Sequence, residues 1–322
     1  MLPQSDRWLI ADVGGTNARF ATCSLEAQEL QHVITLPTNS FDTLERAASH
    51  YLKSTSQAIP TAVCIAVAGP VVNGNATLTN NTWQINQDAL RQTFATNLAF
   101  VLNDFEAIAH ALPEIGASES CTLGGPGVNS SAPRRCLGVI GPGTGLGAAG
   151  VIIERQHVTA IVSEAGHVGF APESDVQRHI LTRLASRYGR VSDERVVSGQ
   201  GISNIYWALS DSDHDLEDAA TIFERFETGT DDIAQQAVEE FFRCLGQVSG
   251  NFALALGAYD GIFIAGGIAQ RHAHVLKKSA FRSGFEAKGR HSELMASIPT
   301  RLIEHPYPGL LGAKMFAAAY AC

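Results

Sequence analysis

Hydrophobic residues along the chain occur in two patterns, short continuous runs and longer segments in which they recur at the spacing of one helix face. The short runs are typical of buried strands, and they are RWLIAD (7–12), ATCSLE (21–26), TAVCIAVAGP (61–70), AFVLND (99–104), CLGVIGP (136–142), GVIIE (150–154) and GIFIAGG (261–267). Segments 41–54 and 233–256 show the helical spacing. Because strands and helices alternate, the pattern predicts an α/β protein with largely parallel sheets and crossover helices.

Two polar stretches, NSSAPRR (129–135) and SDSDHDLED (210–218), are interpreted as exposed loops. The acidic second stretch is more typical of a solvated surface than of a ligand site. The most apolar span, 251–269, is broken by Asp260 and by several glycines. A membrane-spanning helix disfavours such residues, so we expect a helix, a turn and a buried strand there.

Length and charge limit the function further. The 322 residues are enough for about two domains, at roughly 150 residues each. A net charge of −9 disfavours nucleic acid and anionic membranes as partners, because both require clustered Lys and Arg. The six cysteines are scattered without a C-x-x-C pair, which indicates neither a zinc site nor a disulfide framework. The N-terminus lacks the pattern of a signal peptide, so we expect a cytoplasmic protein whose partners are small molecules.

The stretches 8–23 and 136–154 form a weak internal repeat, because both have the order strand, Gly-Thr turn, strand. When the Gly-Thr pairs at 15–16 and 143–144 are aligned, Asp12 lies opposite Ile140. The repeat predicts two similar halves. It also indicates that whatever Asp12 does is done by the first half only.

Both repeated turns are rich in glycine, which raises the possibility of a phosphate site. The second turn contains a formal G-x-G-x-x-G at Gly145, Gly147 and Gly150, with Glu164 at about the distance of a ribose-binding acid. A dinucleotide fingerprint must open a helix, whereas the residues that follow are β-branched and typical of a strand. A Walker A loop is excluded because the chain contains no Gly-Lys dipeptide. What remains is a pair of hairpin turns whose backbone N–H groups can surround a phosphate.

Seven motifs follow one another along nearly the whole chain: ADVGGTNARF (11–20), LNDFEA (102–107), GPGTGLGAA (141–149), EAGHVGF (164–170), SDERVVSGQGI (192–202), IAGGIAQR (264–271) and PGLLGA (308–313). In this order they resemble the bacterial glucokinase family, within the hexokinase and actin-like ATPase superfamily. The resemblance implies an ATP-dependent kinase that transfers the γ-phosphoryl group to the 6-hydroxyl of glucose. It also implies a glycolytic role and a homodimer.

The resemblance further implies a two-domain α/β protein with the actin-like ATPase (ribonuclease H-like) fold and an interdomain cleft. The small domain is expected to be discontinuous, with residues 1–114 and 305–322, and the large domain to comprise residues 115–304. The C-terminal helix that follows PGLLGA is then expected to pack on the N-terminal domain.

Asp104 follows a strand of the predicted sheet, and the carboxyl ends of parallel strands are where ligands of α/β proteins bind. A carboxylate at that place can accept the proton of an attacking hydroxyl. The alternative is structural, because Asn103 with Glu106 fits a capping box at the start of a helix. The sequence alone leaves both interpretations open. The resemblance makes Asp104 the catalytic base and a sugar ligand, and Asn103 a further sugar ligand.

Glu164 and His167 lie in a glycine-bearing segment, where a carboxylate and an imidazole are suitable partners for sugar hydroxyls. The alternative is that both residues are structural, with their polar atoms hydrogen-bonded within the protein. Glu194 matches a further sugar ligand of the family, although a Glu near a helix start also favours the helix dipole.

The nucleotide is assigned to three segments. Asp12 precedes the first turn and could hold hydrated Mg²⁺ through water, or it could hydrogen-bond its own turn. Thr16 and Thr144 can add hydroxyl donors to phosphates, and the pair Gly266–Gly267 allows either close approach of the adenosine or tight packing of strand on helix. The full set expected to bind ATP is Ala11, Asp12, Val13, Gly14, Gly15, Thr16, Gly143, Thr144, Gly145, Gly266 and Gly267.

Two alternatives to the glucokinase hypothesis remain. One is a sugar kinase of the repressor, kinase and open-reading-frame (ROK) type that acts on another hexose. That type carries a Cys-x-Cys zinc motif soon after its Glu-x-Gly-His segment, whereas this chain has no cysteine between Cys136 and Cys244. The other is an actin-like ATPase of assembly or chaperoning, which would lack the predicted sugar residues.

Overall fold

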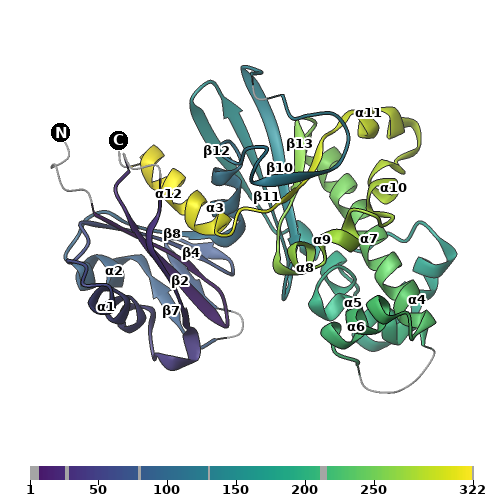
Figure 1. The fold of residues 1–322 in the computed structure, drawn as a ribbon, viewed down its shortest axis with the longest axis horizontal. Helices are drawn as coiled ribbons and strands as arrows, with labels where there is room; N and C mark the ends of the chain where they lie inside the picture. Colours follow the sequence, from purple (N-terminus) through teal and green to yellow (C-terminus); the bar gives the residue numbers. More distant parts are fainter. Residues whose placement is uncertain (1–6, 26–28, 79–80, 130, 211–215, 321–322) are drawn as a thin grey trace. The chain divides into compact units, whose positions relative to one another are not determined.

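A computed structural model describes residues 7–25, 29–78, 81–129, 131–210 and 216–320 (Figure 1). Contacts divide the chain into two compact units. The first contains residues 1–115, 157–162 and 305–322, and the second contains residues 116–156 and 163–304. Both units combine helices with β-sheet, so the predicted α/β class is confirmed.

The main sheet of the first unit has five strands in the order β3-β2-β1-β4-β8. Their bounds are β1 Trp8–Val13, β2 Asn17–Cys23, β3 Gln31–Pro37, β4 Ala62–Val67 and β8 Ala99–Asn103. A small second sheet comprises β5 Val71–Val72, β6 Asn75–Thr77 and β7 Gln84–Asn86. The helical elements are η1 Thr38–Ser40, α1 Leu44–Ser54, α2 Gln87–Phe94, α3 Asp104–Ala111 and α12 Pro308–Tyr320.

Both faces of this five-stranded sheet are buried, which explains the continuous apolar runs. Along β1, Leu9, Ala11 and Val13 belong to the core that includes α1 and α2, whereas Trp8 and Ile10 belong to the core that includes α3 and α12. Figure 1 shows α12 beside α3 on one side of the sheet. The two helices approach closely, because a Cβ atom at Gly312 would overlap the carbonyl group of Ala107.

A second large sheet has six strands in the order β12-β11-β10-β13-β14-β9. Its strands belong to the second unit except β12, of which residues 157–162 are grouped with the first unit. Their bounds are β9 Ser120–Gly124, β10 Arg134–Pro142, β11 Leu146–Glu154, β12 His157–Ser163, β13 Gly261–Ile264 and β14 Thr300–Ile303. The helical elements of the second unit are η2 Ala165–His167, α4 Asp175–Tyr188, η3 Asp193–Arg195, α5 Gly199–Leu209, α6 Ala219–Thr228, α7 Asp232–Leu256, α8 Gly267–Arg271, α9 Ala273–Leu276, α10 Phe281–Glu286, η4 Gly289–His291 and α11 Ser292–Ser297.

The internal repeat is confirmed by the topology of the two sheets. In each sheet, a glycine-turn hairpin (β1–β2 or β10–β11) lies beside strands that run parallel to its first strand. The prediction of largely parallel sheets was wrong, because both sheets are mixed. The reason is local: a tight glycine turn can only join neighbouring antiparallel strands, whereas parallel neighbours need a longer crossover.

The predicted helices are observed as α1, which begins after the N-cap Thr43, and as α7. The predicted loop 129–135 was partly wrong, because β10 already begins at Arg134; residue 130 lies outside the described residues. Of the predicted loop 210–218, residues 211–215 lie outside the described residues, and Asp218 is the N-cap of α6.

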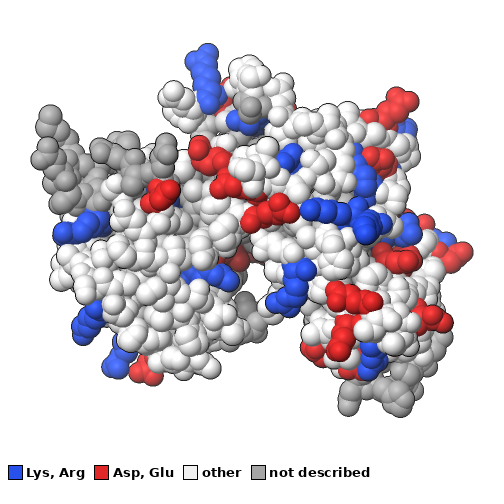
Figure 2. Space-filling view, viewed as in Figure 1, with Lys and Arg blue, Asp and Glu red and all other residues white. Residues whose placement is uncertain are grey.

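Charged side chains of both signs occur on the surface of the described residues. On the face drawn in Figure 2, basic and acidic side chains of the described residues are interspersed, and the basic ones form no large continuous patch. Among the helices that the structure describes, none is both long enough and apolar enough to cross a membrane.

Candidate active site

The first glycine turn joins β1 to β2 and leaves two successive backbone amides available. The amide of Gly14 closes the turn by donating to Asn17 O at 2.9 Å. The carbonyl of Gly15 is held from two other segments, by Thr38 Oγ1 at 2.8 Å and by Asn81 Nδ2 at 3.4 Å. Within the described part of the chain, the amides of Gly15 and Thr16 donate to no protein acceptor. Two such N–H groups in sequence form the kind of nest that binds anions.

The second turn, between β10 and β11, repeats this arrangement. Gly143 donates to Gly145 O at 2.8 Å, and Gly199, the first residue of α5, donates to Gly143 O at 2.8 Å. The amides of Thr144 and Gly145 again donate to no protein acceptor among the described residues. In both turns, the first glycine of the predicted set therefore closes the turn, and the two residues after it offer the free amides.

Asp12 lies on β1 just before the first turn, and its alternative, a hydrogen bond to its own turn, is not what the structure shows. Its carboxylate is paired instead with Arg19 on β2, at 3.3 Å, and its side chain is 20% exposed. Gly309, at the start of α12, packs against it so closely that a Cβ atom there would lie 2.9 Å from Asp12 Cγ. Burial raises the pKa of Asp12, and Arg19 opposes that rise.

Asn103 and Asp104 lie at the junction of β8 and α3. The capping box of Asn103 with Glu106, which was the structural alternative, is confirmed. Asn103 Oδ1 accepts hydrogen bonds from the amides of Phe105 (2.9 Å) and Glu106 (3.2 Å), and Glu106 Oε2 accepts from the amide of Asn103 at 3.3 Å. Asn103 Nδ2 also donates to Gly69 O at 3.0 Å. One hydrogen of that amide group remains for a ligand, so capping and ligand binding are compatible.

The sheet register brings Asp104 to the same edge as the first turn. Val13 at the end of β1 pairs with Val67 on β4, and Val67 pairs with Asn103 on β8, with all three strands parallel. Asp12 and Asp104 are therefore next to strand ends separated by two strand spacings, or roughly 10 Å. This edge of the sheet therefore has room for a phosphate at the first turn and for a hydroxyl group beside Asp104.

Glu164, His167 and Glu194 come together in the second unit, although Glu194 is far from the other two in sequence. His167 Nε2 lies 3.9 Å from Glu164 Oε2, and His167 Nδ1 lies 4.0 Å from Glu194 Oε1. The side chains are 59%, 57% and 30% exposed for Glu164, His167 and Glu194. An imidazole between two accessible carboxylates, at distances longer than hydrogen bonds, leaves polar atoms free for hydroxyl groups.

The glycine-bearing segment that contains Glu164 and His167 is partly helical. Residues 165–167 form the short helix η2, and Glu164 precedes it. Gly166 is necessary there, because a Cβ atom would overlap the carbonyl oxygen of Leu146. Arg190 Nη2 donates to His167 O at 2.7 Å and fixes the segment from the other side.

Glu194 connects this polar cluster directly to the second glycine turn. Its Oε2 accepts a hydrogen bond from the amide of Leu146 at 3.0 Å, and a Cβ atom at Gly145 would overlap the same oxygen. Its neighbour Asp193 is buried, with 3% of its surface exposed, and donates from its amide to Val168 O at 3.0 Å. Burial raises the pKa of Asp193 to about 7.

The pair Gly266–Gly267 between β13 and α8 serves two different purposes. Gly266 has φ +90°, and a Cβ atom would overlap the carbonyl oxygen of Pro142, so tight packing explains this glycine. Gly267 has no atom within 4 Å of the position of a Cβ. Only Gly267 is therefore open to a ligand.

The sequence interpretation missed the residues that support the site: Arg19, Thr38, Asn81, Leu146, Arg190 and Gly309. Arg19 could have been found, because a hairpin centred on Gly15–Thr16 pairs Asp12 with Arg19, as the register shows. Leu146 directly follows the second turn in sequence, whereas Thr38, Asn81, Arg190 and Gly309 contact the site through tertiary structure and carry no local sequence signal.

Comparisons with known proteins identify the family to which the chain is similar. A family profile described as Glucokinase matches residues 9–320. The chain is 38% identical over 311 residues to a glucokinase of Pectobacterium atrosepticum, which covers 96% of each chain. It is 37% identical over 314 residues to a glucokinase of a Caulobacter species, which covers 95% of this chain and 94% of the relative.

Among solved structures, the chain is similar to a glucokinase from an Antarctic psychrotroph, with a TM-score of 0.86 and 32% identity over 99% of this chain and 100% of the other. It shares its fold with a ROK family glucokinase from Streptomyces griseus in complex with glucose and AMPPNP. That match has a TM-score of 0.62 and 18% identity, and it covers 95% of this chain and 97% of the other.

Proposed function

This chain belongs to the glucokinase family and phosphorylates glucose with ATP, and we propose that Asp104 is the catalytic base of that reaction. The observation that carries the proposal is the shared edge of β1, β4 and β8, which holds the free amides of the first turn and the carboxylate of Asp104. In phosphoryl transfer the protein mainly positions the groups and neutralises charge. A carboxylate beside the 6-hydroxyl accepts its proton as the oxygen attacks the γ-phosphorus.

The sugar is bound by Asn103 and Asp104 from the first unit and by Glu164, His167 and Glu194 from the second. The support is chemical: these five residues offer carboxylate oxygens, an imidazole and one amide hydrogen, which suit the donors and acceptors of several hydroxyl groups. Binding from both units requires an interdomain cleft of the actin-like, ribonuclease H-like kind. In that arrangement residues 1–114 with 305–322 form the small domain and residues 115–304 the large one.

ATP is held by its phosphates on the amides of the two turns and by its adenosine near Gly267. The hydroxyls of Thr16 and Thr144 add donors. Mg²⁺ fits the donor set, because one accessible carboxylate beside phosphates suits an ion that keeps several of its waters. Asp12 would hold it through water, and the ion would neutralise charge on the phosphates.

Two further expectations from the family remain part of the proposal: a homodimer and a cytoplasmic location. A kinase of the ROK type for another hexose is the alternative activity. An assay of ADP release across hexoses, pentoses and glycerol separates the two, because the alternative predicts that another hexose gives a higher kcat/KM than glucose.

The role of Asp104 is tested by Asp104→Asn, which keeps the shape of the side chain but not the proton acceptor. We expect kcat to fall by about 10²- to 10⁴-fold, with a smaller change in the glucose Kd measured by calorimetry. Glu164→Gln should instead weaken glucose binding first, since that carboxylate takes no proton.

A matched control is Asp175→Asn, which changes the first residue of α4 just as Asp104→Asn changes the first residue of α3. Asp175 is paired with Arg178 at the surface and lies outside the proposed site. It should leave kcat unchanged. Full activity of the Asp104→Asn enzyme would reduce Asp104 to a part of the helix start.

A further inference from the structure

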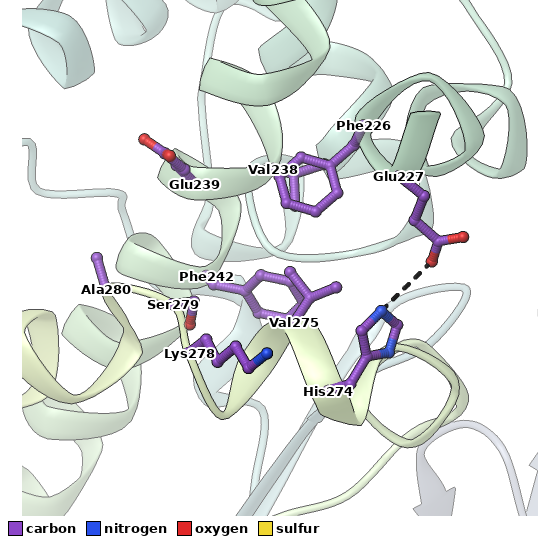
Figure 3. Close-up of a pocket in the computed structure, with 10 residues that line it drawn as sticks. All are labelled: Phe226, Glu227, Val238, Glu239, Phe242, His274, Val275, Lys278, Ser279 and Ala280. Atoms are coloured by element: carbon purple, nitrogen blue, oxygen red, sulfur yellow. Dashed lines mark ion pairs between the residues drawn. The ribbon is translucent and has the colours of Figure 1, made fainter. Parts of the chain in front are cut away.

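The second unit contains a cavity that none of the proposed roles uses. Its volume is about 630 Å³, and it lies between the C-terminal end of α6, the first half of α7 and the segment from α9 to residue 280 (Figure 3). Its apolar lining is made by Phe226, Val238, Phe242 and Val275. Phe226 is partly exposed, whereas Phe242 is fully buried behind the surface of the cavity. A cavity of this size with an accessible aromatic ring is suited to a small organic ligand.

The charged side chains that line the cavity point in different directions. Glu227 is paired with His274, whose Nε2 lies 3.8 Å from Glu227 Oε1. Figure 3 draws the carboxylate of Glu239 pointing away from the other lining residues, whereas the ammonium of Lys278 points toward their middle. Lys278 forms no ion pair with any residue that the structure describes, although its neighbour Lys277 is paired with Glu304 at 3.5 Å. Lys278 is therefore the charged group that is turned toward the middle of the lining.

We propose that this cavity is a second ligand site, which binds a small organic anion with a flat apolar ring. The ring lies against Phe226, the partly exposed aromatic side chain of the lining, where burial of its apolar surface drives binding. The anionic group lies at Lys278, close enough to replace part of its hydration with a charge-assisted contact. The combination of an apolar lining with Lys278 favours this class of ligand. A neutral apolar ligand would leave the ammonium of Lys278 without an ionic partner, and a cation would be repelled by it.

The test uses two probes that share one apolar body. The first is 8-anilinonaphthalene-1-sulfonate, and the second is N-phenyl-1-naphthylamine, which lacks the sulfonate. Fluorescence titration of the full chain should show one binding site for both probes, with the sulfonate bound more tightly. Addition of glucose and ATP should leave both affinities unchanged.

Three variants locate the site. Lys278→Gln should weaken the sulfonate about fivefold, the effect of losing one exposed ionic contact, and leave the neutral probe unchanged. Lys277→Gln is the control, because it removes a neighbouring lysine that does not line the cavity. Ala280→Trp places a large side chain at the partly exposed rim and should abolish binding of both probes, while its melting temperature shows whether the fold is intact.

Several results would overturn the proposal. Equal affinities for the two probes would remove the anion preference, and unchanged binding to Ala280→Trp would place the probes elsewhere. Competition by ATP would make the cavity part of the nucleotide site. Sedimentation velocity measures dimerisation in parallel. If probe binding is lost to the same extent as dimers form, the cavity is an interface between two copies of the chain.

Discussion

Substitution of Gly145 tests whether the second glycine turn and the proposed sugar residues work as one unit. The φ angle of Gly145 is outside the left-handed region, so alanine causes no backbone strain there. Its new Cβ would overlap Glu194 Oε2 and lie 3.3 Å from Glu194 Cδ. The carboxylate must therefore move by roughly 1 Å to restore an ordinary contact. That movement breaks its hydrogen bond from the Leu146 amide, now 3.0 Å long.

The expected effect on stability is small, because two terms oppose each other. Loss of the Leu146 bond to a side chain that is 30% exposed costs about 1 kcal/mol or less. Replacement of glycine by alanine restricts the unfolded chain and stabilises the protein by about 0.4–1 kcal/mol. The effect on glucose should be larger, because one charge-assisted hydrogen bond is worth about 1.5–3 kcal/mol, or roughly 10- to 100-fold in affinity.

The assay is the KM for glucose at saturating ATP, together with urea unfolding. Gly143→Ala is the matched control, because it lies in the same turn, gains the same restriction of the unfolded chain and has no atom within 4 Å of the new Cβ. We expect Gly145→Ala to raise the glucose KM about 10- to 100-fold and Gly143→Ala to leave it unchanged. An unchanged glucose KM in Gly145→Ala would show that Glu194 does not bind glucose from the position seen here.

Three other predictions concern single side chains. Burial raises the pKa of Asp193 to about 7, so between about pH 4 and pH 7 the native state keeps a proton that the unfolded chain has released. The free energy of unfolding should fall as the pH rises through that window, by up to about 4 kcal/mol, and urea unfolding at pH 5 and pH 8 should show that Asp193→Asn removes this dependence. Asn103→Asp keeps a cap for α3 but loses the donor to Gly69 O, so it should change the glucose Kd more than the melting temperature; equal loss of stability in Asn103→Asp and Asn103→Ala would contradict this. Asp12→Asn should raise the Mg²⁺ concentration needed for half-maximal activity several-fold without changing the glucose Kd, as metal titration beside calorimetry would reveal.

Much of the framework could be predicted because it depends on local rules. The runs around β1, β4, β8, β10 and β13 are apolar on both faces, and a strand buried on both sides needs no alternation. The second glycine turn could be identified as a hairpin because the segment that follows it is β-branched rather than helical, and the internal repeat extends that interpretation to the first turn. The mixed character of the sheets also followed from those turns, and it was missed because alternation of strands and helices was given more weight.

The assembly of the site could not be predicted from local rules. Glu194 reaches Leu146 across 48 positions of sequence, and Gly309 reaches Asp12 from the other end of the first unit. Such contacts depend on how helices pack on sheets, and no periodicity encodes them. The sequence offered two competing interpretations of Asn103, a helix cap and a sugar ligand. Only the hydrogen bonds in the structure show that the cap leaves one amide hydrogen of Asn103 for a ligand.

The two hairpins have become different although their turns are alike. In the first, a carboxylate stands on the strand itself, at Asp12, and Arg19 and the start of α12 hold it beside the free amides of the turn. In the second, Ile140 occupies the matching strand position inside the core, and the carboxylate near the turn is Glu194, supplied by η3. In the proposed function, the strand-borne carboxylate of Asp12 lies beside the phosphates of ATP. Glu194 Oε1 lies 4.0 Å from His167 Nδ1, so Glu194 links the second turn to the proposed sugar residues. The repeat therefore accounts for the two similar turns, and the different placement of one carboxylate beside each supports the proposal that the first serves a metal and the second a sugar.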